Sequence, residues 1–125
     1  MKIGDQLVSL EPAKELKELG VKQDSLFAWY RYANTTNIVI DDRDRQECEE
    51  KLCSAYTVAE LGEMLPIECS LYKSRNRELY GDKILFFCSD SNGRVLIYSE
   101  KEADARAKML IYLIKEGIIK AEDIK

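Results

Sequence analysis

The side chains that most often carry out catalysis are scarce in this sequence. It contains no histidine, which is the commonest general base and the usual partner of a nucleophilic serine or cysteine. Its six glycines are scattered along the chain and do not cluster into a phosphate-binding loop. We therefore expect no catalytic triad and no nucleotide site, and we interpret the protein as a noncatalytic one without a cofactor.

The thiols are the next candidates for chemistry, at Cys48, Cys53, Cys69 and Cys88. No two of them are spaced as C-x-x-C, so a structural zinc ion would need all four thiolates from scattered positions. We expect reduced thiols and no bound metal. One alternative is a small hydrolase whose nucleophile is the lone thiol of Cys48 or Cys53. Such a hydrolase could also use carboxylates, for example those of Glu68 and Glu78.

An acid-rich stretch covers residues 41–50, which hold six acidic residues against Arg43 and Arg45. Carboxylate oxygens are the ligands that calcium and magnesium prefer, but the stretch lacks the ligand spacing and the central glycine of a calcium loop. We predict an exposed loop that binds no metal. Its charge suggests a second alternative function, that of an acidic competitor for a nucleic-acid-binding protein.

Aromatic residues crowd one predicted strand, residues 25–32, with the sequence SLFAWYRY. Alternation along a strand places Tyr30 and Tyr32 on one face, and Phe27 and Trp29 on the other. Trp, Tyr and Arg are enriched at the hot spots of protein interfaces. We predict that a partner surface includes the exposed members of this set, with Trp29 or a neighbouring Tyr as its anchor. The alternative is a central strand that helices cover on one face and that is partly packed on the other.

Apolar periodicity and the residues at the ends predict three helices, over residues 11–19, 58–65 and 100–116. Ser9 and Gly20 mark the two ends of the first helix, and Gly117 ends the third. Two capping boxes, in which a hydroxyl side chain precedes Glu by three residues, mark the other starts: Thr57 with Glu60, and Ser99 with Glu102. The third helix carries an apolar stripe, so we expect it to form the main helical face of the core.

The predicted strands comprise a hairpin and a meander: 25–32 with 36–40, then 67–73, 83–89 and 94–98. The last turn of the meander contains Asn92 and Gly93, a pair that favours a tight hairpin. No β-crossover-β repeat is present, so the strands should be antiparallel. The predicted fold class is α+β, a mainly antiparallel sheet of about five strands with three helices packed mostly on one face.

Length and charge limit the remaining possibilities. The 125 residues suit one core, so we expect residues 1–125 to fold as a single domain. The 19 basic and 23 acidic side chains give a net charge of −4, which argues against direct nucleic-acid binding. The first residues lack the apolar run of a signal peptide, and no segment has the length of a membrane helix. We expect a cytoplasmic protein that does not bind membranes.

Several stretches resemble a group of small uncharacterised proteins from prophages and other mobile elements of gut bacteria. They are SLEPAKELKELGV at 9–21, SLFAWY at 25–30, YTVAELGEMLP at 56–66 and ADARAKMLIYLI at 103–114. Because they coincide with the predicted caps and helical faces, the resemblance implies a shared fold rather than a shared active site. It implies no site residues, but it does imply an accessory protein of a mobile element.

The leading hypothesis is therefore a noncatalytic protein-interaction or modulating module. It would act inside the bacterial cell on a protein partner that the sequence does not identify, and self-association is one form that this could take. The small hydrolase and the acidic competitor are the alternatives.

Overall fold

The computed structural model describes residues 6–32, 35–40, 50–66, 69–75, 77–90, 93 and 95–124, and it describes the side chains of all of these except 31–40, 50 and 51. The helices are α1 (Leu10–Glu18), α2 (Val58–Met64), α3 (Arg77–Tyr80) and α4 (Glu102–Lys115). The strands are β1 (Phe27–Tyr32), β2 (Thr35–Ile40), β3 (Glu50–Ser54), β4 (Ser70–Arg75), β5 (Ile84–Ser89) and β6 (Leu96–Ser99). The predicted α+β class is confirmed.

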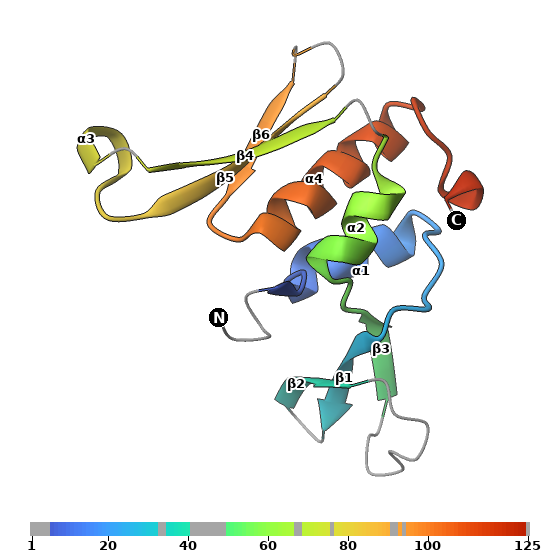
Figure 1. Ribbon diagram of the computed structural model, residues 1–125. Coiled ribbons are helices and arrows are strands. Elements are labelled where there is room, and N and C mark those ends of the chain that lie inside the picture. Colours follow the sequence, from blue (N-terminus) through green and yellow to red (C-terminus); the bar gives the residue numbers. More distant parts are fainter. Residues whose placement is uncertain are drawn as a thin grey trace.

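The strands form two antiparallel sheets of three strands each, rather than the single sheet expected. β1 lies between β2 and β3 in the first sheet, and β5 lies between β4 and β6 in the second. Figure 1 shows helices α1, α2 and α4 between the two sheets. β3 pairs with the second edge of β1, so both edges of β1 are occupied within the first sheet.

The hairpin β1–β2 and the meander β4–β5–β6 agree with the prediction, but two other elements were not predicted. β3 begins at Glu50, the last residue of the stretch that was expected to be a loop. The rest of that stretch, residues 41–49, lies outside the described residues. The short helix α3 occupies the connection between β4 and β5, where only a loose link was expected.

Helix α2 begins as its sequence predicts. The Glu60 amide donates a hydrogen bond to Thr57 Oγ1 at 3.1 Å, and the Thr57 amide donates one to the Glu60 carboxylate at 2.9 Å. One of the N–H groups that a first helical turn leaves without partners is thereby satisfied, together with the amide of the cap residue. The predicted capping box is confirmed.

The capping box predicted for α4 is wrong. Ser99 is the last residue of β6, so the helix starts too late for its hydroxyl, and Lys101 takes the N-cap position without a side-chain hydrogen bond. Ser9 is the N-cap residue of α1, as predicted. Its side chain nevertheless does not cap that helix, because it bonds to Asp104 of α4.

The ends of α1 and α4 follow the predicted pattern. Gly20 and Gly117 adopt positive φ angles of 94° and 73°, a conformation that residues with a Cβ rarely adopt. Beyond them, the Val21 amide donates to the Leu16 carbonyl at 3.1 Å, and the Ile118 amide donates to the Leu113 carbonyl at 3.0 Å. These bonds satisfy carbonyls that the last helical turn leaves open.

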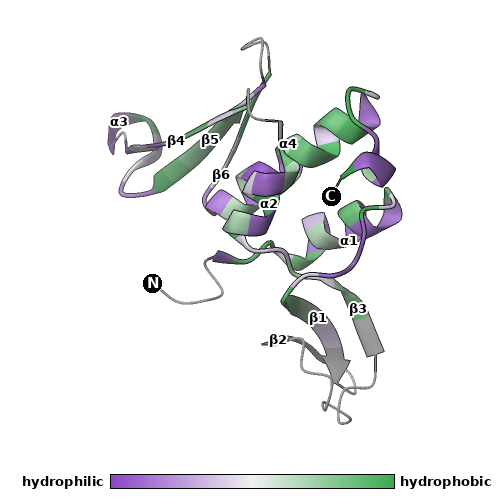
Figure 2. Ribbon diagram, turned by 45° about the vertical axis from the view of Figure 1, so that its right-hand side comes forward, coloured by the Kyte–Doolittle hydropathy of each residue, from purple (hydrophilic) through white to green (hydrophobic). Residues whose placement is uncertain are grey.

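The core lies mainly between the three longer helices. Its main cluster includes Tyr56 and Leu110, both fully buried, and it draws on α1, α2, α4 and β3. A smaller cluster of Cys88, Met109 and Leu113 joins β5 to α4. Figure 2 shows the hydrophobic residues of β5 and of the C-terminal half of α4. Helix α4 therefore contributes to both clusters and positions the second sheet.

Candidate binding surface

The partner surface predicted on β1 is only partly open. Tyr30 exposes 8% of its surface, whereas Phe27 and Trp29 are half-buried. Trp29 packs against the main core, and its Nε1 donates a hydrogen bond to the Val8 carbonyl at 3.2 Å. The side chain of Tyr32 lies outside the described residues. Trp29 thus holds the first sheet against the helices, and a role of these four residues in partner binding stays a prediction.

A second aromatic cluster lies on the sheet β4–β5–β6. Tyr72, Phe87 and Tyr98 are direct neighbours across the three strands. The ring centroids of Tyr72 and Phe87 are 5.3 Å apart, and those of Phe87 and Tyr98 are 5.8 Å apart. Because Cys88 packs against α4, alternation along the strand turns Phe87 and its two neighbours away from that helix. The three rings form one row on the outer face of the sheet.

This row is accessible. Tyr72 exposes 49% of its surface and Tyr98 exposes 59%. Leu96 lies two residues before Tyr98 on the same face and is also exposed, as is Leu79 of the neighbouring helix α3. We define the aromatic face as the outward residues of the second sheet, Tyr72, Leu85, Phe87, Leu96 and Tyr98.

A groove with a volume of about 830 Å³ lies beside the aromatic face. Its apolar lining comes from the sheet and from α3, namely Leu79, Tyr80, Leu85, Phe87 and Tyr98. Its polar lining includes residues at and after the start of α4, among them Lys101, Asp104 and Lys108. Pockets that bind ligands have volumes of about 300–1,000 Å³, so the groove has the size of a binding site.

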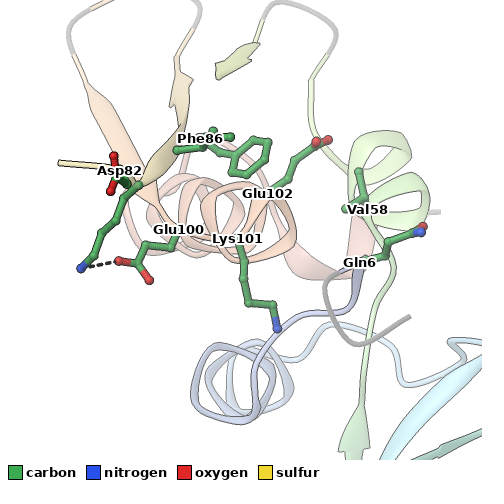
Figure 3. Close-up of a pocket in the computed structure, with 9 residues that line it drawn as sticks. Gln6, Val58, Asp82, Phe86, Glu100, Lys101 and Glu102 are labelled. Atoms are coloured by element: carbon green, nitrogen blue, oxygen red, sulfur yellow. Dashed lines mark ion pairs between the residues drawn. The ribbon is translucent and has the colours of Figure 1, made fainter. Parts of the chain in front are cut away.

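One ion pair lines both this groove and a smaller pocket of about 430 Å³. Lys83 Nζ and Glu100 Oε1 are 2.8 Å apart, and Lys101 lines both hollows with them. Figure 3 shows the pair in the smaller pocket, with Lys101 pointing toward α1. The hydrogen bond that Lys83 donates to the Glu100 carboxylate raises the pKa of Lys83 above its ordinary value, because it stabilises the charged form.

Asp104 of α4 connects the groove to the start of α1. Its Oδ1 accepts a hydrogen bond from the Ser9 amide, and its Oδ2 accepts one from Ser9 Oγ, both at 2.7 Å. Lys101 Nζ donates to Ser9 Oγ at 3.2 Å. Asp104 is buried, and both of its oxygens are engaged. The arrangement therefore fixes two helices to each other and leaves Asp104 poorly placed to bind a cation.

The thiols of Cys53 and Cys88 are poorly placed for nucleophilic chemistry, because both are buried. Cys53 and Cys88 each expose 1% of their surface, and Cys53, Cys69 and Cys88 are not in disulfides. Burial, with a smaller effect from Cys69, raises the pKa of Cys88 to about 11, so its reactive thiolate is rare at neutral pH. Cys48 lies outside the described residues.

In the described part of the chain, no group of three Cys, Asp or Glu side chains could hold a metal ion. Of the helices described, none has the length and apolar character needed to cross a bilayer.

Comparison with known proteins returns no relative. No family model matches the chain, and neither does any curated protein or solved structure. The resemblance to proteins of prophages and mobile elements therefore stays a prediction.

The sequence contains only a partial signal for the aromatic face. Tyr72, Phe87 and Tyr98 all lie in strands that were predicted as a meander. Alternation alone left open whether Phe86 or Phe87 faces outward, because both are large and apolar. The pairing register places Phe87 on the same face as both tyrosines, and the packing of Cys88 on α4 makes that face the outer one.

Proposed function

We propose that this protein is a noncatalytic protein-interaction module, and that it docks a partner protein on the aromatic face. The observation that carries the proposal is the row of Tyr72, Phe87 and Tyr98, whose outer rings are half-exposed on the sheet face opposite the one that packs on α4. Soluble monomers rarely leave contiguous apolar patches open, and such patches mark interaction sites. Tyrosine is also one of the residues that dominate binding energy at interfaces.

Sheet stability alone is a weaker explanation for these residues. Aromatic pairs across strands contribute roughly 0.2–1 kcal/mol each, which accounts for contact between the rings but not for their exposure. Leu79 contacts this region from α3 and exposes 75% of its surface. A partner that covered Tyr98 and Leu79 together would remove both from water.

A single-stranded nucleic acid fits this surface less well than a protein does. Bases bind to aromatic platforms by stacking on open ring faces. The rings of Tyr72 and Phe87 stack on each other, with 12° between their planes, so their facing sides are already covered. The net charge of −4 also opposes a phosphate backbone.

The alternative of a thiol hydrolase has little support. Burial keeps the sulfur atoms of Cys53 and Cys88 away from substrate, and the raised pKa of Cys88 keeps that thiol protonated at neutral pH. The acidic-competitor alternative rests on residues 41–50, nearly all of which lie outside the described part of the chain, and no contact of the described residues favours it.

The test is affinity capture from the cells that naturally make the protein, with single variants compared by quantitative mass spectrometry. We expect Tyr98→Ser and Tyr72→Ser to lose a partner that the unmodified protein retains, with circular dichroism unchanged. The matched control is Ile118→Ser, because Ile118 exposes 59% of its surface, as Tyr98 does, but does not line the groove. Capture that survives both tyrosine variants and is lost in Phe27→Ser would move the surface to β1.

A further inference from the structure

The groove beside the aromatic face has a chemistry of its own, which narrows the kind of partner that it fits. Resting on the function proposed above, we infer that the groove binds a peptide segment of the partner in which carboxylates flank a bulky apolar side chain. Two features of the groove support this inference, its apolar lining and its excess of positive charge.

The apolar part is the lining that the sheet and α3 provide. Leu85, Phe87 and Tyr98 contribute from the strands, and Leu79 contributes from α3. A volume of about 830 Å³ accommodates a large aromatic or branched side chain together with part of its backbone. Anchor residues of this kind, seated in pockets, supply most of the binding energy of small interfaces.

The charge part comes from the polar side of the groove, where three lysines face two acids. Both acids are already engaged, since Glu100 pairs with Lys83 and Asp104 accepts two hydrogen bonds from Ser9. Lys108 is exposed and has no ion-pair partner among the described residues. Lys101 donates to the neutral hydroxyl of Ser9. The groove therefore offers positive charge on a chain whose net charge is negative, and an acidic ligand complements it.

Other ligand classes match the lining less well. A basic peptide would meet the ammonium groups of Lys101 and Lys108, while the Asp104 carboxylate is buried and that of Glu100 already pairs with Lys83. A phosphopeptide is usually held by the planar fork of arginines, and the groove is lined by lysines with no arginine among its described residues.

The test is selection of random linear peptides displayed against the purified full chain, followed by synthesis of the enriched sequences. We expect enrichment of Trp, Phe or Leu next to Asp or Glu. Fluorescence anisotropy then gives the dissociation constant for each variant. Tyr98→Ser should weaken binding by about tenfold or more, which corresponds to about 1.4 kcal/mol. Lys108→Glu should weaken it by about tenfold at low salt and by less at high salt.

Matched controls separate the groove from general effects of charge and hydrophobicity. Lys120→Glu makes the same charge change at an exposed lysine that does not line the groove, and Ile118→Ser removes an equally exposed apolar side chain. Neither should change the affinity. Leu79→Ser serves as a second groove variant if Tyr98→Ser disturbs the sheet, because Leu79 lies on α3 outside the strands.

The outcomes distinguish the inference from the proposed function. Enriched peptides without acidic residues, or affinity unchanged by Lys108→Glu, would overturn the inference even if Tyr98→Ser abolished binding, and the docking surface would stand. Binding unaffected by both Tyr98→Ser and Leu79→Ser would overturn the surface as well. A chain that enriches no peptide and instead dimerises through Tyr98 would show that the occupant is a second copy.

Discussion

Asp104 is the residue whose replacement should disturb the helices most directly. It is buried in α4 and holds the start of α1 through two hydrogen bonds of 2.7 Å from Ser9. Hydrogen bonds to charged groups contribute about 1.5–3 kcal/mol, so Asp104→Ala should lower the free energy of unfolding by about that amount. Ser9→Ala keeps the amide bond and should cost less. Urea melts of both single variants and the double variant measure this, and additive losses would show that the two residues do not interact.

The raised pKa of Cys88 predicts how the free energy of unfolding depends on pH. Burial raises its pKa from 9.0 to about 11, so the folded state holds this proton more tightly than the unfolded chain does. The resulting stabilisation is fully present below pH 9 and is lost as the pH rises toward 11. Its size is on the order of 2 kcal/mol.

The measurement compares the unmodified protein with Cys88→Ala in urea melts across this range. The variant loses packing at neutral pH, and we expect the difference between the two proteins to shrink as the pH rises from 9 to 11. Tyr56, whose pKa burial also raises, is present in both proteins and cancels in the comparison. A difference that stays constant with pH would mean that Cys88 titrates normally in the folded state.

Among the elements, α2 and α4 provide contrasting tests of a cap and a core residue. Thr57→Ala removes the hydroxyl that starts α2 and should cost about 1 kcal/mol. Leu110→Ala opens a cavity under α4, where the side chain is fully buried, and should cost about 2–5 kcal/mol. Unfolding free energies from urea melts give the ranking. If Thr57→Ala proved the more damaging change, α4 would not be packed as described.

Local sequence signals predicted the elements that depend on neighbours along the chain. The Thr57 cap, the glycine ends of two helices and both sets of adjacent strands were read correctly, because short-range hydrogen bonds and side-chain alternation determine them. β3 was missed because its strand character depends on pairing with β1 across a long insertion. The cap predicted at Ser99 was wrong because β6 extends to that residue and α4 begins only at Glu102. The Ser9 side chain does not cap α1 because a tertiary bond to Asp104 engages it.

The candidate surface was predictable only in part for a related reason. The residue types of β1 are those enriched at interface hot spots, and they pointed to Trp29 as an anchor. In the structure Trp29 packs against the core and donates a hydrogen bond to the Val8 carbonyl. Tyr72 and Tyr98 lie 26 positions apart in the sequence, and only the register through Phe87 brings them together. Amino-acid composition can suggest which residues bind a partner, but the exposure of those residues depends on which face of the sheet the helices cover.

At the scale of the whole molecule, the two sheets are linked through one layer of helices. The two core clusters share Leu65 and Ile119, and α4 contributes to both. The first sheet joins this layer through Cys53 of β3 and through Trp29. A continuous apolar contact of this kind favours cooperative unfolding, because neither sheet can separate without exposing part of the shared core.

We therefore predict that both sheets unfold in a single transition. Trp29 is the only tryptophan in the chain, so its fluorescence reports on the first sheet, while far-ultraviolet circular dichroism is dominated by the helices. The urea midpoints from the two signals should coincide, and Leu110→Ala should shift both to lower urea by the same amount, since Leu110 lies in the shared layer. The matched comparison is the Trp29→Phe variant, whose unfolding is followed by circular dichroism. This variant should lose some stability but should still unfold in one step rather than two. A fluorescence transition that precedes the circular dichroism transition would mean that the first sheet opens independently, and residues 1–125 would then not fold as one cooperative unit.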